Sequence, residues 1–346
     1  MAGMAGFDSE RYSRQTRFAP LGSAGQARLA AAGVAIVGAG ALGGAAAVAL
    51  VRAGVGRVRI IDRDVPELSN LPRQLLCDEA DVAAGLPKAV AAARHLENVN
   101  TACQVESVVA DLTATNVAEL LGGHDVVVDG TDNFEARFLI NEFCCRERIP
   151  WVHGGAIGAE GRVLAVVPGV TACLRCLVPD PPAPGSLPTC ETAGVRGPAV
   201  LGGGAVQAME AIRLLVGGPR AGDRLLVCDL WEQAWRTVDL APLAATGCPT
   251  CRGSDYPWLE GRIGGRPAVL CGRDAVQVPA AGGGVDLAAV AERLAAVAPV
   301  TANAWIVRAR VEAGIELAVF ADGRAVVTGT REEAKARAIV SRYLGA

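Results

Sequence analysis

Two pairs of cysteines have the spacing of a metal site. Cys173 and Cys176 form one C-x-x-C motif, and Cys248 and Cys251 form a second one much later in the chain. Structural zinc is bound tetrahedrally by four such ligands, and each motif can place two sulfurs on one tight turn. Where thiols stay reduced, the pattern indicates zinc more readily than disulfides. Because four protein sulfurs leave no open coordination position, this Zn²⁺ would be structural and would clamp two distant segments together.

A fifth cysteine, Cys190, lies between the two pairs. It follows a segment, residues 177–189, that contains five prolines and is expected to form an irregular crossover loop. A thiol at the end of this loop could act as a nucleophile if a nearby cation such as Arg196 favoured its thiolate. A structural or dispensable cysteine is the alternative, because spacing does not reveal thiolate activation.

A glycine-rich turn near the N-terminus predicts a nucleotide site. Gly38, Gly40 and Gly43 fit the pattern G-x-G-x-x-G after an apolar run, and Asp62 ends the second expected strand. Glycines let the backbone approach a phosphate, the following helix supplies N–H groups, and the carboxylate can bind ribose hydroxyls. An NAD-dependent oxidoreductase would carry the same pattern, and a tight turn without a ligand is the simplest alternative.

Polar residues further along the chain favour a nucleoside triphosphate over a nicotinamide dinucleotide. Residues 69–74 supply one cation and two amides, and Lys88 opens the next expected helix. Asp132 lies in Asp-Gly-Thr-Asp-Asn at the carboxyl end of a strand, where open α/β sheets bind ligands. A carboxylate there could hold Mg²⁺ against phosphates. Each charge alone could be a solvated surface residue, but together around one sheet edge they indicate a site.

The elements that must position these residues alternate between strand and helix. This alternation predicts an α/β fold with a doubly wound, Rossmann-like sheet, which two later hairpins would extend into a mixed sheet. The expected strands cover residues 34–37, 58–61, 105–109 and 126–128, and the hairpins pair 151–157 with 162–167 and 225–228 with 235–240. The expected helices cover residues 42–53, 88–98, 115–121, 134–148 and 202–216.

The sequence predicts two domains. Residues 1–252 would form the nucleotide-binding domain with its zinc-stapled crossover region, and residues 253–265, which mix Gly, Pro and polar residues, would form a linker. Residues 266–346 would form a small α+β domain in which no chemistry is visible. Its expected helices cover 287–297 and 332–343, and its expected strands lie near 268–271, 304–308, 315–320 and 325–328.

Composition narrows the class of partner. The chain of 346 residues has 51% hydrophobic and 20% charged residues and a formal net charge of −3, which argues against nucleic-acid binding. Residues 29–51 carry no charge and are long enough to span a membrane, but their five glycines favour a strand, a turn and a buried helix. The first 17 residues are charged and have no apolar segment, so we expect a cytoplasmic protein.

Together these motifs resemble the ThiF/MoeB/HesA adenylyltransferases, a family similar to ubiquitin-activating enzymes that activates sulfur carriers. The resemblance covers about residues 10–252, and the order and number of the motifs make it specific. The matching segments are residues 11–15, the turn 38–43, Asp62 with Asp64, residues 67–74, 85–88 and 129–133, both C-x-x-C pairs, and residues 190–194.

The resemblance implies an ATP site. Its nucleotide-binding residues would be Gly38, Gly40, Ala41, Gly43, Asp62, Asp64, Ser69, Asn70, Arg73, Gln74, Lys88, Asp132 and Asn133. Arg73 and Lys88 would offset phosphate charge, and Asp132 would bind Mg²⁺. Ala41 stands where many family members have glycine, and its methyl group would be tolerated because contact there is through the backbone.

The resemblance also implies a reaction. The carboxylate of a ubiquitin-like sulfur carrier ending in Gly-Gly would attack ATP and give an acyl-adenylate and pyrophosphate. The implied catalytic residues are Arg73, Lys88, Asp132, Cys190 and Arg14, with Arg14 reaching into the site of the other subunit of a homodimer. Cys190 would form a thioester or an acyl-disulfide with the activated carrier.

Three further expectations complete the sequence interpretation. Because no rhodanese domain is evident, sulfur would come from a separate protein such as a cysteine desulfurase. The carrier could serve thiamin, molybdopterin or thiolated tRNA, and the motifs do not choose among them. An NAD-dependent Rossmann oxidoreductase and a noncatalytic nucleotide-binding scaffold are the competing interpretations.

Overall fold

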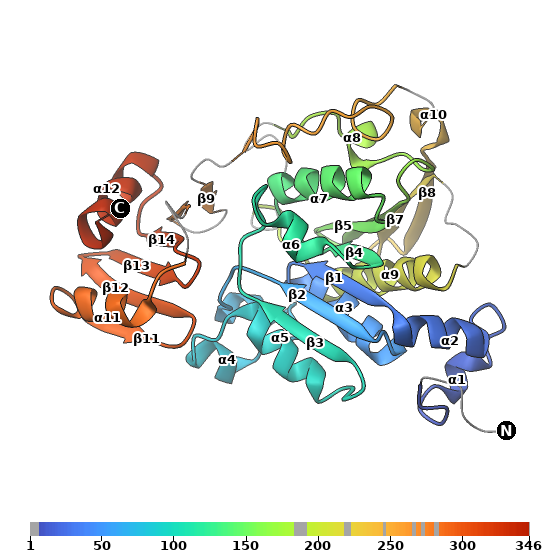
Figure 1. Ribbon diagram of the computed structural model, residues 1–346, viewed down its shortest axis with the longest axis horizontal. Coiled ribbons are helices and arrows are strands. Elements are labelled where there is room, and N and C mark those ends of the chain that lie inside the picture. Colours follow the sequence, from blue (N-terminus) through green and yellow to red (C-terminus); the bar gives the residue numbers. More distant parts are fainter. Residues whose placement is uncertain are drawn as a thin grey trace. The chain divides into compact units, whose positions relative to one another are not determined.

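The computed structural model describes residues 7–182, 192–217, 223–244, 247–264, 268–270, 274–279 and 284–345. The chain divides into two compact units, Met1–Ile263 and Gly264–Ala346 (Figure 1). Each unit has its own sheet and its own core, so the two are described separately.

The first unit is built on an eight-stranded sheet in the order β3-β2-β1-β4-β5-β6-β7-β8 (Figure 1). Its strands are β1 (Gly33–Val37), β2 (Arg57–Ile61), β3 (Gln104–Val108), β4 (Val126–Asp129), β5 (Trp151–Ile157), β6 (Glu160–Val166), β7 (Arg224–Asp229) and β8 (Ala234–Asp239). Strands β1 to β5 pair in parallel, and β6 to β8 continue the sheet in antiparallel pairs. The expected mixed, Rossmann-like sheet is confirmed.

Helices cover both faces of this sheet. They are α1 (Ser13–Thr16), α2 (Gly22–Ala31), α3 (Ala41–Ala53), η1 (Leu68–Asn70), α4 (Glu79–Ala83), α5 (Lys88–Glu97), α6 (Val117–Leu121), α7 (Phe134–Glu147), α8 (Leu174–Leu177), α9 (Gly197–Val216) and α10 (Ala241–Ala244). Along β1, Val34 and Ile36 pack in a core with α2, α3, α5 and α9, whereas Ala35 and Val37 pack in a core with α6, α7 and α8. Strand β1, which is buried on both faces, carries no polar side chain for this reason.

Helix α9 begins at Gly197, five residues before the expected start at Gly202. The missed first turn opens with Gly197 and Pro198, which have low helix propensity although proline fits the first turn of a helix. Glycines 202–204 lie inside the helix. The glycines are required by packing: a Cβ on Gly204 would lie only 2.6 Å from the Cβ of Ala45 on α3. The backbones of α3 and α9 therefore approach closely because both helices carry small residues where they meet.

Within the described ranges, α9 is the one helix long and apolar enough to cross a membrane by length and composition. It packs on α3 and on strands β4, β5 and β6, as the core helix of a globular unit does. The uncharged segment 29–51 is the end of α2, then β1, then most of α3. The strand, turn and buried helix expected for that segment are confirmed.

A buried carboxylate on α7 fixes the segment 253–263. The backbone N–H groups of Trp258 and Leu259 each donate to Oε2 of Glu142 at 2.9 Å. The ring of Trp258 also packs near Phe138, with 5.8 Å between the ring centroids. This segment, which the composition favoured as a linker, therefore packs within the first compact unit. Its glycines and prolines shape turns against α7 rather than a free connection.

The second unit is a six-stranded antiparallel sheet in the order β11-β12-β13-β14-β10-β9, with two helices. Its elements are β9 (Ala268–Leu270), β10 (Ala275–Val278), α11 (Leu287–Ala295), β11 (Val300–Ala302), β12 (Ile306–Glu312), β13 (Ile315–Phe320), β14 (Ala325–Thr328) and α12 (Glu333–Leu344). Both helices contribute to one core with Val307 and Ala309 of β12. Strands β10 and β11 were not foreseen because each is short and has a polar residue between its apolar ones, whereas the equally short β9 and β14 begin with an uninterrupted apolar run.

Glu142 predicts a pH dependence of stability. Burial raises its pKa from 4.5 to about 7, so the folded state favours the protonated acid. The stabilising contribution is therefore complete below the unfolded pKa and is lost as the pH rises through about 7. Urea unfolding at about pH 5 and at about pH 8 measures this loss. Between these two pH values the free energy of unfolding should fall less for Glu142→Gln than for the unchanged protein, and the difference between the two falls should be up to about 3 kcal/mol.

The exposed Glu147 lies on the same helix and offers a matched control. Glu147→Gln should keep the pH dependence of the unchanged protein. If Glu142→Gln kept it too, the buried acid would not be its source.

Candidate functional site

The glycine turn connects β1 to α3. Gly38 has a φ of +93°, and a Cβ on it would lie 2.7 Å from the carbonyl oxygen of Gly130. A Cβ on Gly43 would lie 1.8 Å from the carbonyl oxygen of Gly38. At Gly40, by contrast, the nearest atom to a Cβ would be Nε2 of Gln74 at 3.9 Å. The fold itself requires the first and third glycines, whereas the second leaves backbone open to an approaching phosphate.

The side chain of Asp62 binds backbone N–H groups on both sides of this site. Its Oδ2 accepts the N–H of Ala39 at 2.7 Å, and its Oδ1 accepts the N–H of Asp64 at 2.7 Å. The carboxyl group is buried, and this burial raises its pKa although the charge of Lys88 acts in the opposite direction. Asp62 therefore lies at the end of β2 beside the turn, the position from which a carboxylate reaches a ribose in Rossmann-like folds.

Lys88 and Asp64 form an ion pair at the same edge of the sheet. Nζ of Lys88 lies 3.2 Å from Oδ2 of Asp64, and the backbone N–H of Lys88 donates to the carbonyl oxygen of Asp64 at 2.8 Å. The lysine side chain is buried where α5 begins. An anion bound at the glycine turn would share this ammonium group with Asp64.

Helix η1 and the turn after it present the predicted amides and arginine. Asn70 is buried, and its Oδ1 accepts the N–H of Glu67 at 3.0 Å, which caps η1. Arg73 is half-buried and donates to the carbonyl oxygen of Ser69 at 2.7 Å. Gln74 is buried beside the glycine turn. The structure thus brings Gln74 to the turn and uses Asn70 to hold the loop that carries Arg73.

The loop after β4 closes the other side of the turn. A Cβ on Gly130 would lie 2.7 Å from the Cα of Gly43, so the end of β4 touches the start of α3. Asp132 follows and is exposed to solvent. Asn133 caps α7, because its Oδ1 accepts the N–H of Ala136 at 2.8 Å. Strand β1 lies between β2 and β4, so these loops meet at the point where the strand order reverses.

Arg63 joins the acidic residues around this point, and no sequence motif marked it. Its Nη1 lies 3.0 Å from Oδ1 of Asp111, and its Nε lies 3.9 Å from Oδ1 of Asp64. Burial opposes the charge, but Asp111, Asp64 and Asp132 together raise the pKa of Arg63. The charge of Asp132 thus adds to that of two other carboxylates in stabilising the Arg63 cation.

A buried polar network lies under the Asp132 loop and was not foreseen. Asp129 is fully buried and accepts the N–H of Thr131 at 2.9 Å and its hydroxyl at 2.6 Å. Nδ1 of His153 lies 2.7 Å and Nε of Arg137 lies 3.5 Å from Oδ2 of Asp129. Burial opposes ionisation, but these partners prevail and lower the pKa of Asp129. Burial lowers the pKa of His153, so the pair is an ionised aspartate and a neutral histidine.

Helix α9 completes the network with Gln207. Its Nε2 donates to the carbonyl oxygen of Asp129 at 2.7 Å. A Cβ on Gly154 would lie 2.3 Å from the Gln207 amide, so this glycine of β5 makes room for that side chain. Arg137 donates to the carbonyl oxygen of Thr131 at 2.6 Å. Side chains from α7, α9 and β5 thereby hold residues 129–131, and the position of Asp132 depends on that segment.

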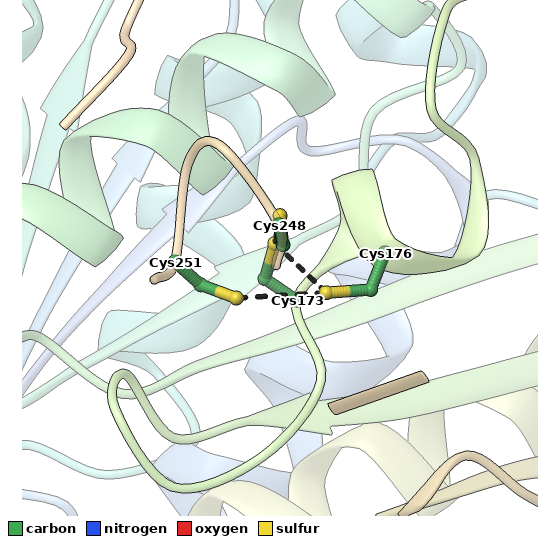
Figure 2. A group of neighbouring side chains, drawn as sticks. All are labelled: Cys173, Cys176, Cys248 and Cys251. Atoms are coloured by element: carbon green, nitrogen blue, oxygen red, sulfur yellow. Dashed lines mark hydrogen bonds between the residues drawn. The ribbon is translucent and has the colours of Figure 1, made fainter. Parts of the chain in front are cut away.

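The four cysteines of the C-x-x-C motifs converge on one point (Figure 2). Their sulfurs are 3.9 Å apart for Cys173 and Cys176, 3.8 Å for Cys173 and Cys248, and 3.5 Å for Cys176 and Cys251. A disulfide would require about 2 Å, whereas four thiolates around one Zn²⁺ at about 2.3 Å lie about 3.8 Å apart. The geometry is that of a cluster that could bind a metal.

Side chains around the cluster hold both of its halves. Asn141 of α7 donates to Sγ of Cys173 at 3.7 Å and accepts the N–H of Leu174 at 3.0 Å. Arg175 donates to Oγ1 of Thr250 at 3.1 Å, which links the two motifs directly. Hydrogen bonds from Cys145 and from the cluster thiols lower the pKa of Cys173 far below its ordinary value. The hydrogen bonds with Cys173 in turn raise the pKa of Cys176 and of Cys251, so the contacts within the cluster favour the thiolate, the form that binds metals, on Cys173.

Comparison with known proteins decides the family. The sequence model of the ThiF family matches residues 12–250, which contain the glycine turn, the Asp132 loop and most of the cysteine cluster. The chain belongs to the ThiF family.

Individual proteins similar to this ThiF-family chain support the same assignment. It is 42% identical over 337 residues to the Bacillus subtilis protein named sulfur carrier protein ThiS adenylyltransferase, covering 97% of this chain and 99% of the relative. It is 41% identical over 254 residues to the sulfur carrier protein adenylyltransferase of Thermus thermophilus, covering 70% of this chain and 90% of that one. The crystal structure of E. coli MccB has the same fold, with a TM-score of 0.61 and 22% identity over 70% of this chain and 72% of that one.

The ThiF resemblance also implied roles for Arg14 and Cys190. Arg14 is exposed on α1. Cys190 lies outside the described residues. The next described residues are anchored, since the N–H of Gly158 donates to the carbonyl oxygen of Gly194 at 2.9 Å and the N–H of Arg196 donates to that of Gly158 at 2.8 Å. The guanidinium of Arg196 also lies over the Trp231 ring, 5.8 Å from its centroid.

The network under the ThiF-family site includes Asp129 but not Asp132, so these two aspartates of one motif should differ in their effect on stability. Asp129→Asn should lower the free energy of unfolding by about 3 kcal/mol, because it leaves Arg137 buried without a countercharge. Asp132→Asn removes an exposed charge and should change it by less than about 0.5 kcal/mol. Urea unfolding of both variants measures the difference. Equal effects of the two substitutions would contradict the structural role given to Asp129.

Proposed function

We propose that this chain is a sulfur-carrier-protein adenylyltransferase that uses ATP and Mg²⁺. One observation carries the proposal: the open backbone at Gly40, the carboxylate of Asp62, the ammonium of Lys88 and the Asp132 loop meet at a single switch point of the sheet. The names of the two relatives support the same activity. The substrate would be a ubiquitin-like sulfur carrier protein that ends in Gly-Gly.

The proposed step is a displacement at phosphorus. A carboxylate oxygen of the last glycine attacks the α-phosphorus of ATP and forms a C–O–P mixed anhydride. The bond from the α-phosphorus to the bridging oxygen breaks, and pyrophosphate leaves with that electron pair. No proton transfer is needed, so the protein contributes position and charge rather than acid-base catalysis.

The charged residues divide this work. Lys88 and Arg73 offset the negative charge that moves to pyrophosphate. Asp132 would hold Mg²⁺ through a carboxylate oxygen, a ligand type that this cation prefers. Asp62 and Asp64 bind the ribose side, while Ser69, Asn70, Gln74 and Asn133 shape the loops around the phosphates. Gly38, Gly40, Ala41 and Gly43 approach the phosphates through their backbone.

The alternatives predict different behaviour. An NAD-dependent oxidoreductase would use the same turn, but it has no use for Lys88, Arg73 and Asp132 around one phosphate chain. A noncatalytic scaffold would bind ATP without turning it over. The charge distribution disfavours the first alternative, and the exchange assay below distinguishes the second.

The assembly and the sulfur steps belong to the same proposal. The chain acts as a cytoplasmic homodimer in which Arg14 reaches the partner's nucleotide site. Cys190 takes the activated carrier as a thioester or an acyl-disulfide, and a separate protein such as a cysteine desulfurase supplies sulfur. Residues 1–252, with the segment 253–263 that packs on α7, form the adenylating domain, and the small domain from residue 266 follows a short connection.

Zn²⁺ is the metal proposed for the cysteine cluster. The spacing of the sulfurs and the convergence of two tight turns suit its tetrahedral geometry. Bound there, it would fasten the base of the segment that carries Cys190 to α7 and would leave no coordination position for substrate.

ATP–pyrophosphate exchange tests the activity. The purified chain should exchange labelled pyrophosphate into ATP with a carrier ending in Gly-Gly and not with the same carrier lacking its last glycine. Asp132→Ala should slow exchange by about 100-fold, in the range expected for lost electrostatic stabilisation of a transition state. Glu147→Gln, on the far end of α7, should leave the rate unchanged.

Two outcomes would count against the proposal. Exchange that does not depend on the carrier would assign the chemistry to another acceptor. ATP binding without exchange, for every carrier with the Gly-Gly end, would favour the scaffold.

Metal analysis tests the zinc assignment. The reduced protein should contain about one zinc per chain, and Cys248→Ser should lose it. Cys228→Ser is the matched control, because Cys228 is equally buried but lies in β7 and donates only to the carbonyl oxygen of Gly161. A reduced protein free of metal, or equal metal content in both variants, would contradict the assignment.

A further inference from the structure

The second compact unit lies beyond the residues matched by the ThiF family, and it contains a cavity of about 220 Å³. Residues of β11, β12 and β13 line it, among them Thr301, Arg308, Arg310 and Glu316. We propose that this cavity binds a phosphate group, either free or on a small metabolite. This site goes beyond adenylation and does not depend on it.

The strand register places both arginines on one face of the sheet. Arg308 and Arg310 alternate along β12 with Val307 and Ala309, which pack in the core with α11 and α12. Side chains two residues apart on a strand point the same way, so both guanidinium groups lie on the face opposite that core. A β-bulge after Arg310 interrupts the pairing of β12 with β13, and bulges of this kind redirect side chains near binding sites.

Neighbouring strands contribute one hydroxyl and one carboxylate. Thr301 of β11 is the register partner of Arg308, and Glu316 of β13 is the register partner of Arg310. Directly paired residues of antiparallel strands have their side chains side by side on one face. The cavity therefore gathers two cations, a hydroxyl and one carboxylate, with a net charge of about +1 at neutral pH.

The fold uses the backbones of both arginines but not their guanidinium groups. Among the described residues, no side-chain hydrogen bond or ion pair involves Arg308 or Arg310, and Nε of Arg308 is buried without an acceptor. The same unit pairs other arginines with carboxylates: Arg324 with Asp322 at 2.9 Å, and Arg331 with Asp274 at 2.6 Å. Buried donors in proteins normally have acceptors, so an unused guanidinium at a cavity indicates an acceptor from outside the chain.

The chemistry of the lining favours phosphate over a simple carboxylate. Guanidinium groups bind oxyanions through several N–H donors at once. Glu316 would repel a fully ionised anion but can accept a hydrogen bond from a P–O–H group. Monohydrogen phosphate offers acceptor oxygens to both arginines and to the Thr301 hydroxyl, and it offers one donor to Glu316. Acetate has no such donor.

Hydrogen–deuterium exchange on the full chain tests this site without interference from the nucleotide turn, because peptides report each region separately. Inorganic phosphate, against chloride at equal ionic strength, should slow exchange in peptides covering residues 297–318. Arg308→Ala and Arg310→Ala should each raise the phosphate concentration needed for half protection by about 10-fold, the effect of one charge-assisted hydrogen bond. Arg337→Ala removes an exposed arginine from α12 and should not change it.

Each remaining result would overturn the proposal. No protection of β11 to β13 by phosphate would remove the site. Equal protection by acetate would show an unselective positive surface instead of a phosphate site. Should Arg308→Ala fail to fold, the exposed Arg310 still decides the question, since undiminished protection in Arg310→Ala would contradict the paired-arginine geometry.

Discussion

The contact among the backbones of Gly38, Gly43 and Gly130 is the constraint on which the site depends. Side-chain carbon on Gly38 or Gly43 would overlap a carbonyl oxygen, so β1, α3 and the end of β4 can meet only through bare backbone. This contact sets the glycine turn at the switch point of the sheet. It also brings the Asp132 loop, from the next strand over, beside the turn. The second motif glycine, Gly40, is free of this constraint, which leaves its backbone for a ligand.

Charged side chains around that contact already have hydrogen-bond or ion-pair partners within the protein. Asp62 and Asp129 are both buried, and each is held by N–H donors that fix a loop. Lys88 and Arg63 face the neighbouring carboxylates. A nucleotide with Mg²⁺ would enter a site whose cations and carboxylates are already in place, as preorganised electrostatic catalysis requires. The cysteine cluster has no part in this proposed chemistry, and with Zn²⁺ bound it would clamp two segments of chain.

Much of this was accessible from the sequence, because the informative signals were local. The glycine turn, the C-x-x-C pairs and the alternating strands each occupy one short segment, and the structure places them as expected. What sequence reasoning missed depends on partners distant in the chain: His153 on Asp129, Glu142 on Trp258, and Gly204 on Ala45. Gly197 and Pro198 concealed the start of α9, because both have low helix propensity although proline fits the first turn of a helix. Arg308 carried no motif, since an arginine without a partner is recognisable only in three dimensions.

The central claim is that this edge of the sheet transfers AMP to a carrier carboxylate. Intact mass spectrometry of a Gly-Gly carrier, mixed with the chain, ATP and Mg²⁺ and quenched within one turnover, tests it most directly. The account predicts that the carrier gains the mass of one adenylyl group, and that Gly40→Val, which should fold but block phosphate approach, abolishes this gain. A carrier that stays unmodified while ATP is bound, or one adenylylated equally by Gly40→Val, would contradict the account.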